Sequence, residues 1–120
     1  MNPKIDTILM SSDGHHATVS GPINWDDDET SATFAAAIGQ MQGGHIVFAA
    51  GQNATLFTRA NDQRWETPVN TLNGKKLVLG LADGWATAAV LETAGSYECY
   101  PWQVDGLQVT EGEAVVSARH

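Results

Sequence analysis

Apolar and polar positions alternate in short segments along most of this chain. From Lys4 to Val109, runs of apolar, aromatic and β-branched residues are separated about every eight to twelve positions by Gly, Asn, Asp or Pro. The alternation is clearest over residues 17–25, where one face would carry Ala17, Val19, Gly21, Ile23 and Trp25. A period of two residues is that of a β-strand with one buried face. The pattern therefore predicts a series of short strands joined by tight turns.

Residues 30–42 are compatible with two secondary structures. As a strand, the segment would place Ala32, Phe34, Ala36 and Ile38 on one face. As a helix, it would begin after Asp28, end at Gly43 and carry Phe34, Ile38 and Met41 on one stripe. The alanine content favours the helix, whereas the strands predicted on either side favour a strand. We predict a strand, and an α+β fold with a helix at 30–42 is the alternative.

Two dipeptides predict hairpin turns. Asn73-Gly74 and Asp83-Gly84 supply the residues that best tolerate the positive φ angles of a type I′ turn. Between them, Leu77, Leu79 and Leu81 would share one face of a strand. The next strand would begin at Trp85, and because it is apolar on both faces, we expect it to be central.

The fold class follows from the number of strands and from the lack of a clear amphipathic helix. About seven to nine short strands with hairpin turns form an antiparallel sandwich or a small barrel. We predict an all-β fold, an antiparallel β-sandwich that forms one domain over residues 1–120, in which residues 110–120 form a short strand or a C-terminal arm. The residues expected in the core are Trp25, Phe34, Ile38, Phe48, Leu56, Trp65, Val69, Leu79, Trp85 and Trp102.

Charge and segment lengths disfavour several classes of protein. The chain has 14 Asp and Glu against 6 Lys and Arg, which gives a net charge of −8. Binding to nucleic acids or anionic membranes needs clustered cations, so we expect neither as a partner. We also expect no signal peptide and no membrane span, because no apolar run has the required length or flanks. A cytoplasmic or virion-associated protein is therefore expected rather than one secreted by the general route.

A series of spaced residues resembles a known family. It runs from Val19…Trp25 through Ala32-Thr33-Phe34…Gln40, Gly51 and Arg64-Trp65…Val69 to Gly84…Ala86-Thr87-Ala88. Over residues 17–105 this spacing is similar to that of small bacterial immunoglobulin-like β-sandwich proteins, most of which have no assigned activity. The resemblance implies an immunoglobulin-like sandwich and carries over no functional residues. The chain departs from that pattern because Cys99 is its only cysteine and because we expect no leader.

An acidic loop is the first candidate metal site. Asp26, Asp27, Asp28 and Glu29 offer oxygen ligands for calcium, although they lack the alternating spacing and the central glycine of an EF-hand loop. The alternative is a solvated loop whose charge limits association.

Histidines form the second candidate metal site. His15 and His16 would bind zinc only if folding brought one of them to Asp13, His45 or His120. The alternative is a solvent-exposed pair at the start of a strand.

Aromatic residues form a candidate ligand-binding surface. Many sugar-binding sandwiches stack sugar rings on exposed aromatic side chains with polar neighbours. Tyr97, Tyr100 and Trp102 lie around Pro101 among polar residues, which indicates partial exposure. Trp25, Trp65 and Trp85 fit core positions better, because a buried tryptophan is common in sandwiches.

The sequence shows no catalytic constellation. Residues 11–16 contain Ser, Asp and His, but a triad is defined by geometry in space rather than by neighbours in sequence. We therefore predict a non-catalytic structural or protein-interaction subunit, with no cofactor, that binds a protein partner or itself in a larger assembly such as a virion or surface structure. The alternative is a carbohydrate- or small-ligand-binding module, and the third hypothesis is a small hydrolase.

Overall fold

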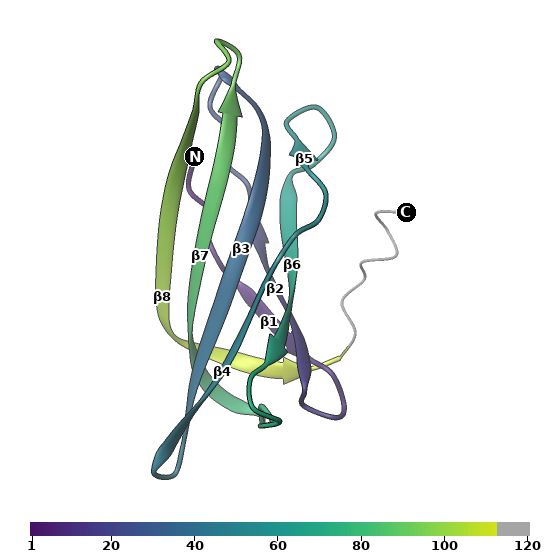
Figure 1. Cartoon of the computed structure of the whole chain (residues 1–120), viewed down its shortest axis with the longest axis vertical. Helices are drawn as coiled ribbons and strands as arrows, with labels where there is room; N and C mark the ends of the chain where they lie inside the picture. Colours follow the sequence, from purple (N-terminus) through teal and green to yellow (C-terminus); the bar gives the residue numbers. More distant parts are fainter. Residues whose placement is uncertain (113–120) are drawn as a thin grey trace.

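The computed structural model describes residues 1–112, and these form eight strands and no helix (Figure 1). The strands are β1 (Thr7–Met10), β2 (His16–Pro22), β3 (Glu29–Gln42), β4 (His45–Gln52), β5 (Phe57–Thr58), β6 (Arg64–Thr71), β7 (Gly80–Glu92) and β8 (Tyr97–Glu111). The strand predicted at 30–42 is confirmed, and the alternative helix is wrong. Most of the predicted C-terminal arm, residues 113–120, lies outside the described residues.

The strands form one closed barrel, so the predicted antiparallel sandwich is wrong. The order β4-β6-β2-β1-β8-β7-β3 closes because β3 also pairs with β4, and the short β5 is added to β3. The sheet is mixed, because β1 and β8 run parallel whereas the other pairs are antiparallel. β3, β7 and β8 have 14, 13 and 15 residues. Strands of this length let a twisted sheet coil until its edges meet.

The barrel closes through two narrow seams. On one side, β4 and β6 pair only through Ala49↔Thr71 and Ala50↔Asn70. On the other side, β1 pairs with β8 over the three residues 109–111. Both seams join strands that are not consecutive in the chain, and alternation within a single strand carries no information about such pairings.

Side-chain hydrogen bonds extend the seam between β4 and β6. The amide of Asn53, directly after β4, donates to the carbonyl oxygen of Glu66 at 2.6 Å. Its own oxygen accepts a hydrogen bond of 2.6 Å from the hydroxyl of Thr67, which is fully buried. A buried polar group needs such a partner, so Asn53 both satisfies Thr67 and connects the two strands.

A glycine allows the backbones to meet at this seam. A Cβ atom placed on Gly51 would lie 1.9 Å from the carbonyl oxygen of Pro68 in β6. No side chain fits at that distance. β4 therefore reaches β6 only because residue 51 lacks a side chain.

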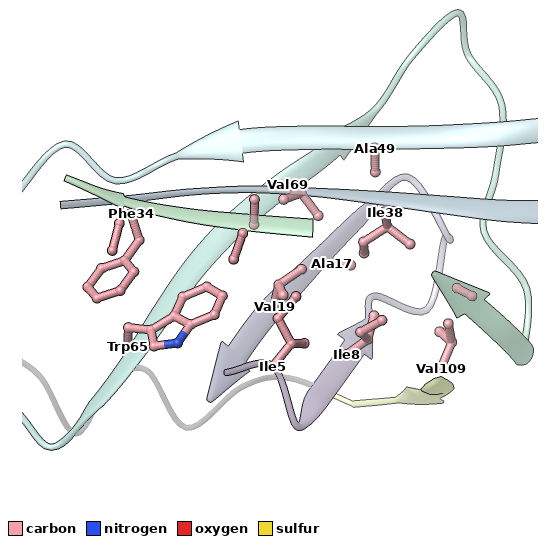
Figure 2. Close-up of a cluster of buried hydrophobic side chains, with 14 of the residues drawn as sticks. Ile5, Ile8, Ala17, Val19, Phe34, Ile38, Ala49, Trp65, Val69 and Val109 are labelled. Atoms are coloured by element: carbon pink, nitrogen blue, oxygen red, sulfur yellow. The ribbon is translucent and has the colours of Figure 1, made fainter. Parts of the chain in front are cut away.

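Aromatic stacking fills one part of the barrel interior (Figure 2). The ring of Phe34 stacks on Trp65 with centroids 5.1 Å apart and meets Phe57 edge-on at 5.4 Å. The Trp65 indole nitrogen donates to the carbonyl oxygen of Lys4 at 3.0 Å. Aliphatic side chains such as Ile8 and Ile38, drawn in Figure 2, fill another part of the interior.

The predicted core is correct in part. Phe34, Ile38, Trp65 and Val69 are buried, and Trp25 and Trp102 are partly buried against the core. Phe48, Leu56, Leu79 and Trp85 are exposed. Phe48 and Trp85 point outward from their strands, because their neighbours in β4 and β7 occupy the interior. Leu56 and Leu79 lie outside the strands.

The two predicted turns differ in outcome. Asn73 and Gly74 have φ angles of 57° and 68°, so a turn with the predicted positive φ angles is present, but the predicted hairpin is wrong, because the strands on either side, β6 and β7, do not pair with each other. The turn at Asp83-Gly84 is wrong, because both residues lie inside β7. A Cβ atom on Gly84 would be 3.1 Å from the Ile5 side chain, so this glycine makes room for the core.

Replacement of Gly51 by alanine should test the closure. Because the new Cβ atom would displace the Pro68 carbonyl group, we expect Gly51→Ala to lower the free energy of unfolding by about 3 kcal/mol or more. Gly44→Ala, in the turn between β3 and β4 with nothing within 4 Å, is the matched control. Its effect should stay within about 0.5 kcal/mol. Urea denaturation followed by circular dichroism measures both, and equal effects would contradict the steric account.

An ion pair should make stability depend on pH. Arg64 donates to both carboxylate oxygens of Asp6, at 3.0 and 2.7 Å. The hydrogen bonds from Arg64 and Thr7 lower the pKa of Asp6 below its usual value, against the opposing effect of partial burial. The ion pair therefore stabilises the fold above pH 3.8, the ordinary value, and is lost as the pH falls through the lower folded-state pKa.

At neutral pH, Asp6→Asn should lower the free energy of unfolding by less than about 1 kcal/mol, because the ion pair is half exposed. In strong acid the substitution should leave the free energy of unfolding unchanged, because Asp6 is then protonated in both states. Urea denaturation across the pH range measures this difference. Asp105→Asn, which removes only an exposed contact with Gln103, is the control. If Asp6→Asn lowered the free energy of unfolding by the same amount at every pH, the charge of Asp6 would not be the cause of the stabilisation.

Candidate functional site

One outer surface of the barrel is nearly free of charge. The neighbouring strands β4, β3, β7 and β8 form it, and their paired residues that point away from the core define what we call the apolar face. Two charged side chains belong to this surface: Asp83 of β7 and Asp105, an exposed residue of β8 that lies opposite Asp83 at a β-bulge. The uncharged residues include Ile46, Phe48, Ala50 and Gln52 of β4, Thr33, Ala35, Ala37, Gly39 and Met41 of β3, Leu81, Trp85, Thr87, Ala89 and Leu91 of β7, and Tyr97, Cys99, Pro101, Gln103 and Gln108 of β8.

Large side chains protrude from one half of the apolar face. Met41, Ile46, Phe48 and Trp85, which we call the apolar cluster, are 66%, 47%, 46% and 36% exposed. They surround Gly39, where a Cβ atom would be 3.2 Å from the Trp85 ring and 3.3 Å from the Phe48 ring. The absence of a side chain at Gly39 thus lets two aromatic rings approach from opposite sides. Between them lies a hollow of about 120 Å³.

Small side chains line the middle of the apolar face. Thr33, Ala35, Ala37, Thr87 and Ala89, which we call the small-residue groove, continue along β3 and β7 beyond Trp85. Two hollows of about 170 Å³ each lie over these residues. The small-residue groove therefore lies between the apolar cluster on one side and the exposed side chains of Leu91 and Tyr97 on the other.

Charged segments meet the ends of β3 and β7 on the core side of these strands rather than on the apolar face, because Glu92 follows the outward Leu91 and Gln42 follows the outward Met41. At the end beyond the small-residue groove, Glu92 lies beside Asp28 and close to Glu98, and the hydrogen bond with Asp28, burial and the two negative charges raise the pKa of Glu92. At the other end, Lys75 and Lys76 follow Asn73-Gly74 in a turn that Gln42 ties to β3 with a hydrogen bond of 2.7 Å to the Lys76 carbonyl oxygen.

The side chains of the acidic loop do not converge on one point, because Asp26 and Glu29 face the amino group of Met1 whereas Asp27 faces Arg59. The amino group of Met1 lies 2.9 Å from Asp26 and 3.5 Å from the buried carboxylate of Glu29. Asp27 forms an exposed ion pair with Arg59 at 3.2 Å. Residues 1–112 contain no group of three or more His, Cys, Asp or Glu side chains that could hold a metal ion. The structure thus does not gather the four predicted calcium ligands.

The histidines are also dispersed. The Nδ1 atom of His15 lies 3.1 Å from the Lys75 carbonyl oxygen, and that of His16 lies 2.6 Å from the Asn70 amide oxygen. Asp13 accepts a hydrogen bond from Ser11. His45 begins β4 at the far end of the β3–β4 hairpin, and His120 lies outside the described residues.

The three predicted aromatic ligand residues lie on two sides of β8. Tyr97 is 71% exposed and belongs to the apolar face. Tyr100 and Trp102 point to the inner side and pack against the core. The ammonium group of Lys4 lies 5.9 Å from the centre of the Trp102 ring. These residues therefore do not form one row of exposed rings.

The apolar face is not among the sites predicted from the sequence, because Phe48 and Trp85 are predicted to lie in the core. A signal was present, since the segment that begins at Trp85 is apolar on both sides. We interpreted this as a central strand buried on both faces. The strand is central, but only its inner side is buried, and Trp85, Thr87 and Leu91 are exposed.

Comparisons with known proteins place no further constraint on this site. No protein-family model, curated protein or solved structure was found to match the chain. The resemblance to small bacterial immunoglobulin-like proteins is thus neither supported nor refuted by them, and the sandwich that it implied is replaced by the barrel. The described residues include no helix that is long and apolar enough to cross a membrane.

Tyr100 should ionise at unusually high pH. Its hydroxyl group donates a 2.8 Å hydrogen bond to Glu98, and this bond, burial and the surrounding negative charges raise the pKa of Tyr100 to about 12. Ultraviolet absorbance titration measures tyrosinate, and Tyr100→Phe identifies the contribution of this residue. Glu98→Gln should lower the pKa of Tyr100. An unchanged titration, in a variant whose circular dichroism shows that it remains folded, would contradict this account.

Proposed function

We propose that this chain is a non-catalytic, protein-binding β-barrel that docks a protein on the apolar face. The single observation that carries the proposal is that the outer surface of four adjacent strands bears only two charged side chains among its described residues, Asp83 and Asp105, beside an exposed apolar cluster. Where one side of a sheet faces water, apolar residues usually point to the core and polar residues alternate with them on the outer side. A contiguous exposed apolar patch instead marks a site of interaction.

The size of the apolar face suits a protein partner. Strands lie about 4.8 Å apart and successive outward residues about 6.6 Å apart, so four strands and five outward positions cover about 600 Å². A specific protein interface of standard size buries about 800 Å² on each partner. The apolar face is therefore close to the area that such an interface requires.

The relief of the apolar face also favours a protein over a small ligand. Its hollows measure about 120 to 170 Å³, whereas pockets for small ligands have about 300–1,000 Å³. Exposed aromatic side chains near the centre of a surface are the residues that contribute most to protein binding. Trp85 and Phe48 would be these anchors.

Site-specific photocrosslinking in the cells to which the gene is native would test the proposal. A photoreactive side chain at Thr87, within the apolar face, should form an adduct with a protein of defined mass. The same group at Asn61, an exposed residue of the loop between β5 and β6, should not. Trp85→Glu should abolish the Thr87 adduct without unfolding the barrel, because Trp85 points outward. Equal labelling from Thr87 and Asn61, or no protein adduct at all, would contradict the proposal.

A further inference from the structure

We propose that an extended segment of another protein binds along the open edge of β8, where it adds a strand to the sheet beside the apolar face. The segment would pair its backbone with residues 97–103 and lay alternate apolar side chains over a partly exposed part of the core. This inference rests on the proposed function and names the part of the partner that the chain recognises.

One edge of β8 has no neighbouring strand over most of its length. β8 pairs with β7 from Tyr97 to Val109, but on its other side it pairs with β1 only at residues 109–111. In Figure 1 the upper part of β8 is accordingly the outermost strand of the sheet. Within residues 1–112, no other segment donates or accepts a hydrogen bond at the open edge between residues 97 and 103.

The ladder with β7 shows which backbone groups face that edge. The Glu92 N–H donates to the Ser96 carbonyl oxygen at 2.8 Å, so the hydrogen-bonded pairs recur at the even-numbered residues of β8 up to residue 102. The odd-numbered residues therefore direct their backbone groups to the open edge. Pro101 is one of them, as expected for a residue without an N–H, because the ladder with β7 needs donors. The full set is Tyr97, Cys99, Pro101 and Gln103.

These groups determine the backbone of the partner. N–H and C=O groups that recur along an open edge are matched by a second extended strand about 4.8 Å away. Strand addition of this kind is a common mode of peptide recognition. Pro101 removes one donor from the middle of the edge and so limits pairing with arbitrary strands. Its carbonyl group, and both backbone groups of Cys99 and Gln103, remain available to a partner.

The core is incompletely covered beside the same edge. Among the described residues, the apolar side chains that pack against the core but are only partly buried are those of Trp25, Tyr100, Trp102, Val104 and Leu107. All of them except Trp25 belong to β8. Side chains on the same face of neighbouring strands lie within about 5.5 Å of each other. An added strand would therefore cover these residues if its inward positions are apolar.

Charge favours a basic segment from a different protein. Glu98 and Asp105 lie on β8, which contains no Lys or Arg, and the chain has a net charge of −8. Lys4, whose ammonium group lies 5.9 Å from the centre of the Trp102 ring, offsets only part of this charge. Complementary charge favours basic residues at the polar positions of the segment. Pairing of β8 with β8 of a second copy would instead bring two acidic strands together.

Amide hydrogen exchange of the isolated chain, measured by NMR, tests the open edge. The N–H groups of Tyr100 and Trp102, which face β7, should exchange about tenfold or more slowly than those of Cys99 and Gln103, which face solvent. Equal protection of all these amides would overturn the inference, because the edge would then already be occupied.

A proline substitution tests strand addition. Gln103→Pro removes an N–H that β7 does not use, so circular dichroism should show an intact fold. The photocrosslinked adduct from Thr87 should nevertheless fall about tenfold, because a carbonyl group of the partner would lose its donor. Gln103→Ala removes the same side chain but keeps the N–H. It is the matched control and should retain the adduct.

Exchange in the presence of the partner tests the same contact without a substitution. The protein identified from the Thr87 adduct should slow exchange of the Cys99 and Gln103 amides about tenfold or more. An adduct that persists in a folded Gln103→Pro variant, or edge amides that stay unprotected, would overturn the inference and leave the proposed function intact. An adduct with a second copy of this chain would overturn the choice of partner. Absence of any Thr87 adduct from the unaltered chain would instead contradict the proposed function.

Discussion

The approach of Gly51 to the Pro68 carbonyl group is the contact on which this fold depends. Without it β4 and β6 would be two unpaired edges, and the sheet would remain open. Open edges are templates for pairing with other chains. The seam has few backbone pairings, and Asn53 supplies further hydrogen bonds from its side chain. Closure is thus achieved mainly by the fit between two backbones.

Closure also decides which apolar residues are buried. The inner sides of β3 and β7 carry small residues such as Ala36, Ala86 and Ala88, while Trp65 and Phe34 occupy part of the interior. Larger side chains of the same strands, such as Trp85, therefore remain outside. The outer surface of these strands, which carries few charges, is then available for contacts between molecules rather than within one.

Local features were predictable from the sequence, whereas pairings distant in the chain were not. The alternation over residues 30–42 and the Asn73-Gly74 turn follow from periodicity and from backbone preferences, and both are present in the structure. A period of two does not say which side of a strand faces the core. For Phe48 and Trp85 that choice depends on the neighbouring strands. Asp83-Gly84 has the composition of a turn, but the room that Ile5 requires places it within a strand.

The parallel pairing of β1 with β8 has a consequence for the order of events during synthesis. Ile8, Leu9 and Met10 find their partners only at Val109, Thr110 and Glu111, about a hundred residues later in the chain. Contacts so distant in sequence slow folding, because a long loop must close before they form. The growing chain therefore cannot complete the barrel until these last residues have left the ribosome. Until then β1 presents an open edge, and this nascent edge is where a chaperone would be most needed.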